Sequence, residues 1–325
     1  MNRRTFVHGV ALAIAAAPRA ARAQPARAVH RLGILSSATP FATDRTTASY
    51  LVPAALRDLG YVEGQNLLVE RRFAEGKLDR LPALARELGQ LRLDVILALG
   101  ASSVPALRDT TANVPIVMFA AVDPVALGWV ASLARPGGRI TGVVITPDTH
   151  LAAKRLELLR EAVPRVKRIA VLTTDEPHAR EQAQITRQVA TAAVVVVEVR
   201  EGAYGQAFEQ MLAASARALI VVASPILNRD RKQIIDLAAR HRLPAIYQWS
   251  DQADEGGLMS YGSSIAALSR RAAVHVDRIL KGASPAELPI EQPSNYELVI
   301  NRKTAQALGL TLPTTLLMRA DRILD

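Results

Sequence analysis

The chain has 325 residues, of which 50% are hydrophobic and 22% are charged, and it contains no cysteine. Its length corresponds to about two domains, and its apolar content excludes a wholly disordered chain. The absence of cysteine excludes disulfide scaffolds, thiolate zinc sites and a cysteine nucleophile. Aromatic residues make up only 4%, and the net charge of +10 is not gathered into runs, so we expect no nucleic-acid partner.

The first 23 residues have the composition of an export signal. A basic start precedes an apolar stretch over residues 10–17 and a small-residue end, Ala21-Arg22-Ala23. This pattern predicts a signal peptide cleaved after Ala23 and a mature protein in the periplasm. Residues 2–7 read NRRTFV and are similar to a twin-arginine export motif, although a general secretory signal also accepts two arginines. An amphipathic first helix is the alternative interpretation.

The rest of the sequence contains a diverged internal repeat. Residues 29–37 and 166–174 share a basic entry, a continuous apolar run and two final hydroxyl residues. Three further pairs follow in the same order: 93–100 with 218–224, 114–119 with 243–247, and 137–142 with 256–262. Continuous apolar runs of this length are typical of strands that are buried on both faces of a parallel sheet.

Helical segments alternate with these strands. In chain order we expect helices at residues 46–59, 78–91, 104–108, 150–162, 176–192, 203–216, 228–242 and 264–280. Strands that alternate with helices predict an α/β fold with two doubly wound lobes. The two long helices at 150–162 and 264–280 are where the chain can cross between lobes, and crossovers of this kind create a hinged cleft. The tail from residue 296 is too short for a domain and completes one lobe.

Motifs of familiar catalytic and cofactor sites are missing from the sequence. The turn after the first strand lacks the glycines of a dinucleotide site, and no P-loop or nucleophile-elbow motif is present. No two of the six histidines stand at metal-ligand spacing. We therefore expect no catalytic residues, no metal and no cofactor. An exported α/β enzyme assembled from scattered residues stays an alternative.

Hydroxyl, acidic and aromatic residues at the carboxyl ends of the strands are the candidate ligand-binding residues, because the crevice of an open α/β sheet lies there. They are Ser36, Ser37, Ser102, Ser103 and Asp123 in the first lobe, and Thr173, Ser224, Tyr247 and Tyr261 in the second. The helix that begins near Ser102 suits a ligand carboxylate, and Asp123 suits a ligand ammonium. The alternatives are helix caps for the serines and Asp123, and core positions for the tyrosines.

Several segments resemble a bacterial family of ABC transporter substrate-binding proteins, of the tryptophan/tyrosine type. They are residues 123–125 (DPV), 133–142 (LARPGGRITG), 256–262 (GGLMSYG), 288–293 (LPIEQP), 297–301 (ELVIN) and 307–310 (ALGL). The resemblance runs from about residue 31 to residue 325. It implies a type 1 periplasmic-binding-protein fold, in which three crossovers join two Rossmann-like lobes. By this resemblance lobe 1 covers 30–146 plus 263–290, and lobe 2 covers 147–262 plus 291–325.

The same resemblance implies a function. A periplasmic binding protein of this family captures a small molecule between its lobes and delivers it to an ABC permease in the inner membrane. We expect an amino-acid-like or carboxylate-bearing ligand, no enzymatic activity and a monomeric protein. The alternative is an exported sensor that uses the same cleft and docks on a membrane kinase. The export signal and the missing helix-turn-helix count against a DNA-binding regulator.

Overall fold

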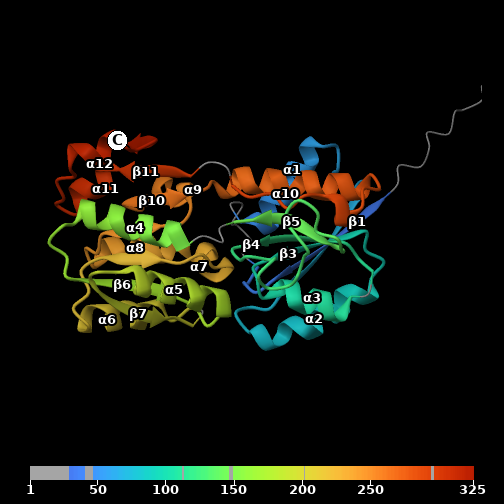
Figure 1. Ribbon diagram of the computed structural model, residues 1–325, viewed down its shortest axis with the longest axis horizontal. Coiled ribbons are helices and arrows are strands. Elements are labelled where there is room, and N and C mark those ends of the chain that lie inside the picture. Colours follow the sequence, from blue (N-terminus) through green and yellow to red (C-terminus); the bar gives the residue numbers. More distant parts are fainter. Residues whose placement is uncertain (1–28, 41–46, 112, 146–148, 201, 294–295) are drawn as a thin grey trace, which may run out of the picture.

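The computed structural model describes residues 29–40, 47–111, 113–145, 149–200, 202–293 and 296–325. The predicted export signal and its cleavage site lie outside these residues. Two lobes, each a sheet with helices packed around it, lie side by side along the longest axis of the molecule (Figure 1). Within the described ranges, no helix is long and apolar enough to cross a membrane.

The first lobe is built on a five-stranded parallel sheet with the order β2-β1-β3-β4-β5. The strands are β1 (His30–Ser36), β2 (Leu67–Phe73), β3 (Val95–Leu99), β4 (Ile116–Ala120) and β5 (Ile140–Val144). Its helices are α1 (Ala48–Asp58), α2 (Leu81–Gln90), α3 (Ser103–Thr110) and α10 (Ile265–Leu280). Helices α1 and α10 cover one face of this sheet, and α2 and α3 cover the other (Figure 1).

The second lobe is built on a seven-stranded sheet with the order β12-β11-β10-β9-β8-β6-β7. The strands are β6 (Arg168–Thr173), β7 (Ala193–Glu198), β8 (Leu219–Val221), β9 (Ala245–Tyr247), β10 (Met259–Gly262), β11 (Glu297–Asn301) and β12 (Arg322–Leu324). Its helices are α4 (Thr149–Ala162), α5 (Pro177–Val189), α6 (Tyr204–Ala213), α7 (Pro225–Arg229), α8 (Arg231–Arg240), α9 (Ser250–Asp254), α11 (Arg302–Ala307) and α12 (Thr314–Met318). Strand β11 runs antiparallel to β10, and the other neighbours are parallel.

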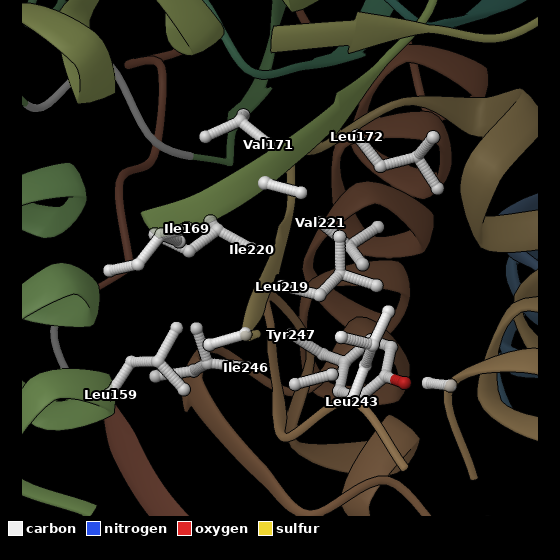
Figure 2. Close-up of a cluster of buried hydrophobic side chains, with 14 of the residues drawn as sticks. Leu159, Ile169, Val171, Leu172, Leu219, Ile220, Val221, Leu243, Ile246 and Tyr247 are labelled. Carbon is white, nitrogen blue, oxygen red and sulfur yellow. The ribbon is translucent and has the colours of Figure 1, made fainter. Parts of the chain in front are cut away.

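Apolar side chains on both faces of the central strands form the cores. All five residues of β3 and all five of β4 are buried, as the continuous apolar runs predict. In the second lobe Val171, Ile220 and Ile246 come from three neighbouring strands and lie in one cluster with Leu159 of α4 (Figure 2). Each lobe thus has its own hydrophobic core, which keeps the strand ends in fixed positions.

The strand order repeats between the lobes. The order β2-β1-β3-β4-β5 has the same connectivity as β7-β6-β8-β9-β10, so the four repeated sequence segments occupy equivalent strands. The chain passes between the lobes after β5, after β10 and before β11. Ahead of the third passage Glu291 still pairs with the first lobe, where its N–H donates to the carbonyl oxygen of Gly142. The lobe boundaries given above stay predictions.

Two features differ from the sequence-based expectations. The second strand of each lobe, β2 and β7, was not located from the sequence, because these edge strands are only partly buried and lack a continuous buried run. The helix expected at residues 228–242 begins only at Arg231, as α8, and a separate short helix, α7, precedes it. Ser224 starts α7 early by accepting hydrogen bonds from its first turn, and Asp230 separates the two helices.

Candidate functional site

A pocket lies between the lobes at the carboxyl ends of the strands, and we call it the cleft pocket. The first lobe contributes strand ends and the start of α1, including Ser36, Ser49, Phe73, Gly100, Phe119 and Ala120. The second lobe contributes the start of α5 and the segment around α7, including His178, Ser224, Pro225, Asn228 and Arg229. A pocket with walls from both lobes is the arrangement in which a bound molecule holds the lobes together.

The wall of the cleft pocket includes aromatic side chains. Phe73 and Phe119 stand at the ends of β2 and β4, and Trp249 comes from the segment between β9 and α9. Trp249 is only 5% exposed and packs with Phe119 and Ile265 in the core of the first lobe, although it follows a strand of the second. Its indole therefore packs across the boundary between the two lobes. The wall suits the apolar body of a small ligand.

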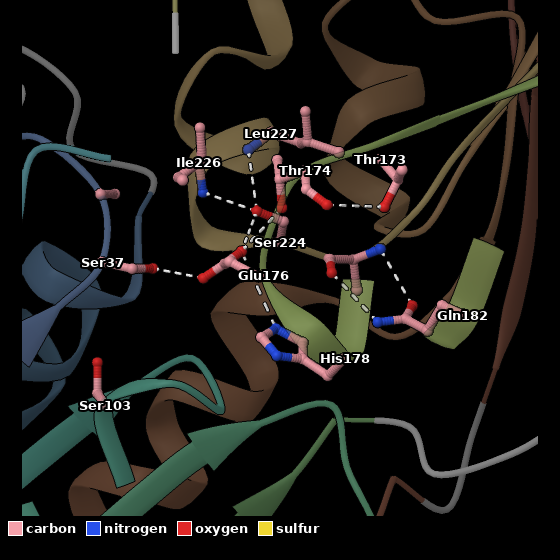
Figure 3. A network of polar contacts seen from close by, with 12 residues as sticks. Ser37, Ser103, Thr173, Thr174, Glu176, His178, Gln182, Ser224, Ile226 and Leu227 are labelled. Atoms are coloured by element: carbon pink, nitrogen blue, oxygen red, sulfur yellow. Dashed lines mark hydrogen bonds and ion pairs between the residues drawn. The ribbon is translucent and has the colours of Figure 1, made fainter. Parts of the chain in front are cut away.

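A buried carboxylate connects the two lobes beside this pocket. Glu176 is fully buried at the start of α5. Its Oε1 accepts a 2.6 Å hydrogen bond from the Ser37 hydroxyl of the first lobe. Its Oε2 accepts from the hydroxyls of Ser224, at 2.6 Å, and Thr174, at 3.3 Å. Figure 3 shows Glu176 at the centre of this network, between the serine of the first lobe and the hydroxyls of the second.

The electrostatic environment of Glu176 is unusual for a buried acid. Among the described residues, no lysine or arginine nitrogen lies within 4 Å of its carboxylate, and the nearest titratable nitrogen is His178 Nε2, at 3.9 Å. Burial lowers the pKa of His178, against the smaller opposing effects of Glu176 and Glu181. At neutral pH the imidazole is therefore neutral, and the hydrogen bonds that the described residues give to the carboxyl oxygens of Glu176 come from hydroxyl groups.

The lobes also touch through backbone and apolar atoms. Gly100 has φ +84°, a conformation that favours glycine. A Cβ at this position would lie 2.7 Å from Cγ of Pro225 in the second lobe and 3.7 Å from the Ser37 hydroxyl. Glycine thus allows the end of β3 to approach the start of α7 closely, next to the bond between Ser37 and Glu176.

Three of the candidate residues lie at or beside the cleft pocket. Ser36 and Ser224 line it, and each hydroxyl oxygen also accepts from a nearby backbone N–H, that of Ala38 or Ile226. Ser37 is fully buried and donates to Glu176 rather than into the pocket. One lining serine thus comes from each lobe, and the hydroxyl of Ser224 also donates to Glu176.

Three other candidates do not line it. The Ser103 hydroxyl donates to the Leu99 carbonyl oxygen at 2.9 Å, and Ser103 lies apart from the network in Figure 3. Ser102 precedes α3 without a side-chain capping bond, and its hydroxyl is buried without a partner among the described residues. Thr173 is fully buried and its hydroxyl is directed to the carbonyl oxygen of Thr174. The expected convergence of Ser37, Ser102 and Ser103 on one anion is therefore not seen.

Asp123 and the two tyrosines occupy positions that match their alternative interpretations. The exposed Asp123 caps a turn, since its Oδ1 accepts from the backbone N–H groups of Val125 and Ala126 at 2.9 and 3.1 Å. Tyr247 is 1% exposed in the core of the second lobe, where burial raises the pKa of its hydroxyl. Tyr261 packs against the same core. None of the three lines the cleft pocket.

The site residues that sequence reasoning missed include Glu176, His178, Arg229 and Trp249, as well as Phe73 and Phe119. Glu176 was counted as the first residue of a helix, although an acid directly before Pro177 is a visible capping signal. Arg229 lies in the segment that was expected to be an uninterrupted helix, where its Nε donates to Asp230 at 2.5 Å. No local pattern pointed to Trp249, whose place depends on packing between the lobes.

The described residues contain no group of three or more histidine, aspartate or glutamate side chains that could hold a metal ion. The chemistry available in the cleft pocket is hydrogen bonding from hydroxyl, amide, imidazole and guanidinium groups, together with an aromatic wall. Such a site binds a small molecule with an apolar part and a few polar groups.

Comparison with known proteins identifies the family of this chain. A model of the family described as "ABC transporter substrate binding protein" matches residues 47–324. The chain belongs to this family. The family is one of extracytoplasmic binding proteins, so the alternative of an exported enzyme is set aside.

Individual relatives agree with that membership. A tyrosine-binding protein of Clostridioides difficile is 27% identical over 260 residues, which is 79% of this chain and 74% of that protein. A structure from Streptococcus pneumoniae, described as an ABC domain in complex with L-Trp, has a TM-score of 0.76 at 22% identity and covers 91% of this chain and all of its own. A conserved domain protein from Vibrio cholerae has a TM-score of 0.78 at 23% identity, covering 91% of this chain and 99% of that one. These structures confirm the two-lobed α/β fold.

Proposed function

We propose that this substrate-binding protein captures an amino-acid-like, carboxylate-bearing molecule in the cleft pocket and delivers it to an ABC permease in the inner membrane. The observation that carries the proposal is that the cleft pocket is walled by both lobes and is lined by aromatic side chains as well as polar groups. A molecule that contacts both walls stabilises the closed arrangement by its differential contacts with that state.

The polarity of the pocket supports this ligand class. Phe73, Phe119 and Trp249 offer contact for an apolar or aromatic side chain. Ser36, His178 and Asn228 line the same pocket with hydroxyl, imidazole and amide groups that can hold polar atoms. The relatives named for tyrosine binding and for a complex with L-Trp suggest which amino acids to test first.

The decisive experiment is a thermal-shift and calorimetry screen with L-tyrosine, L-tryptophan, branched amino acids, nucleosides and organic acids. A captured ligand at 100 times its Kd adds about 2.7 kcal/mol to the free energy of unfolding. Small-angle scattering on the same samples should show a smaller radius of gyration with ligand. A screen in which only nucleosides or sugars bind would contradict the proposed ligand class.

The finer statements about location belong to the same proposal. We infer a periplasmic protein whose signal peptide is cleaved after Ala23, exported by the twin-arginine route. N-terminal sequencing of exported protein should begin at Gln24. Replacing Arg3 and Arg4 by lysine should retain the protein in the cytoplasm, and normal export of that variant would indicate the general secretory route.

A further inference from the structure

A second pocket lies beside the cleft pocket, and a buried arginine forms part of its wall. Arg155 of α4 is 4% exposed and lines this pocket together with residues of α5 and β8. The loop after β4 in the first lobe closes the other side with Ala121, Val122 and Asp123. The space is thus bounded by both lobes, and we call it the Arg155 pocket.

The guanidinium of Arg155 is poorly compensated for a buried cation. Its Nε donates to the carbonyl oxygen of Tyr261 at 2.8 Å, and this is the one hydrogen bond that the described residues give to its five N–H donors. No carboxylate oxygen of the described residues lies within 4 Å of it. Burial lowers its pKa to about 10, so it still carries its charge at neutral pH. A buried cation with one neutral acceptor is costly, which points to an anionic partner.

The other groups of the pocket restrict what that anion can be. Asp123 and Glu181 line the same pocket and are exposed. Two acids near the opening disfavour a multiply charged anion such as phosphate. A single carboxylate matches the planar fork of the guanidinium and carries only one charge.

We propose that Arg155 binds a monocarboxylate in this second pocket and that the bound group bridges the two lobes. The carboxylate belongs either to the captured solute, in which case the inference rests on the proposed function, or to a separate small acid. The chemistry recognised is the same for both sources. The alternative role for Arg155 is a strut that holds the backbone at Tyr261, near the passage from β10 to α10.

The test compares the wild-type protein with Arg155→Met and Arg155→Lys, with Lys154→Met as the matched control. Lys154 is the neighbouring cation on α4, is partly exposed, and pairs with Glu157 at the surface. Each protein is heated in sodium propionate, sodium phosphate and sodium chloride at equal ionic strength. Affinities for L-tyrosine, for tyramine, which lacks the carboxylate, and for 3-(4-hydroxyphenyl)propionate, which lacks the ammonium, are measured by calorimetry.

We expect propionate to raise the Tm of the wild type and of Lys154→Met more than chloride or phosphate does, and to have no such effect on Arg155→Met. Arg155→Met itself should melt at or above the wild-type Tm without ligand, because it removes a poorly compensated charge. Arg155→Lys keeps the charge without the planar fork, so its Tm should rise less with propionate than that of the wild type. If Arg155→Met does not fold, Arg155→Lys provides the test in its place.

The amine and acid probes identify the source of the carboxylate. If it belongs to the solute, Arg155→Met should bind L-tyrosine about tenfold or more weakly while its affinity for tyramine is unchanged. If it belongs to a separate acid, the variant loses the propionate response and keeps its affinity for L-tyrosine. A wild type that responds to propionate but binds no amino acid contradicts the proposed ligand class and leaves this inference standing.

Two results would overturn the inference. One is that propionate, L-tyrosine and 3-(4-hydroxyphenyl)propionate each have the same effect on the Arg155 variants as on the wild type. The other is that Arg155→Met lowers the Tm by several degrees with no change in any carboxylate response, which is the behaviour of a structural strut.

Discussion

The ends of β1 and β6 are equivalent positions of the internal repeat, yet they do different things. Ser36 and Ser37 follow β1, where one lines the cleft pocket and the other donates across to the second lobe. Thr173 and Thr174 follow β6, and both are fully buried within their own lobe. The strands are alike in sequence and topology, so the difference arises in the connections after them.

The connection after β6 is short, and the one after β1 is long. Helix α5 begins at Pro177, and Glu176 at its start covers the hydroxyl end of β6. Helix α1 begins only at Ala48, and Ser37, directly after β1, donates across to Glu176. The second lobe therefore presents a rigid acceptor, and the first lobe presents the donor that meets it on closure. A repeat in the strands does not imply a repeat in the binding groups.

The largest effect should come from one glycine in each lobe that allows a close backbone approach. A Cβ on Gly142 would overlap the Met118 backbone, and a Cβ on Gly262 would overlap the Gln248 carbonyl oxygen. Gly142→Ala and Gly262→Ala should each lower the free energy of unfolding by about 3 kcal/mol or more, as urea denaturation would measure. Gly138→Ala, where a Cβ meets open space, is the control and should be close to neutral. Tolerance of either change would show that the lobes differ in this respect too.

Removal of the shared acceptor should have the next largest effect. Glu176→Ala leaves the hydroxyls of Ser37, Thr174 and Ser224 without the oxygen atoms that now accept from them. We expect a loss of about 2–3 kcal/mol in the free energy of unfolding, since buried donors are left unsatisfied. Thermal unfolding followed by circular dichroism is the measurement. A stable variant with unchanged ligand affinity would show that the buried carboxylate is dispensable for both lobes.

Ser37 and Ser224 both donate to Glu176, and substituting them one at a time separates an effect on ligand affinity from an effect on the stability of the second lobe. Ser224→Ala removes a hydrogen bond within the second lobe and the cap of α7. It should therefore lower the free energy of unfolding by about 1–2 kcal/mol and lower the Tm accordingly. Ser37→Ala removes a bond across the lobes, so its main effect should be about a threefold to tenfold weaker ligand affinity. Calorimetry and melting curves on both variants provide the comparison. Equal effects of the two changes on affinity would contradict the division of roles.

Substitutions of Asp123 test whether this acid of the first lobe contacts the ligand. Asp123→Ala should cost about 1 kcal/mol of unfolding free energy, because it removes the cap on the N–H groups of Val125 and Ala126. Asp123→Asn keeps the accepting oxygen and should be nearly neutral. Neither change should alter the affinity for L-tyrosine more than about twofold. A tenfold loss in Asp123→Asn would instead assign the charge to a ligand ammonium.

The titration of His178 should have the smallest effect at neutral pH and a growing one in acid. Burial lowers the pKa of His178 in the folded protein below its unfolded value, so the unfolded state binds the proton first. Its contribution to stability is therefore complete above about pH 6.5 and is lost as the pH falls toward the folded pKa. Urea denaturation of the wild type and of His178→Asn at several pH values should diverge in that window. Parallel curves would show that His178 does not titrate differently on folding.

The sequence by itself determined that the chain forms two α/β lobes with buried parallel strands. Continuous apolar runs such as those of β3 and β4 predict buried parallel strands, and the alternation with helices predicts the doubly wound order, because these patterns are local in the chain. The repeat of residues 29–37 in 166–174 predicts equivalent buried strands in two lobes, and these are β1 and β6. The edge strands and the separate helix α7 are not predicted by the sequence, since partial burial and side-chain capping leave weaker local patterns.

Only the tertiary structure decided which polar residues meet. Ser37 and Glu176 are separated by 139 positions, and their bond depends on how two independently packed lobes approach each other. Trp249 follows a strand of one lobe and is buried in the core of the other, which no periodicity can indicate. Ser102, Ser103 and Thr173 stand at strand ends as expected, but the orientation of each hydroxyl depends on the rotamer and the acceptors that packing supplies. Strand positions follow from local apolar patterns, whereas side-chain direction and charge compensation follow from contacts that form only when the lobes come together.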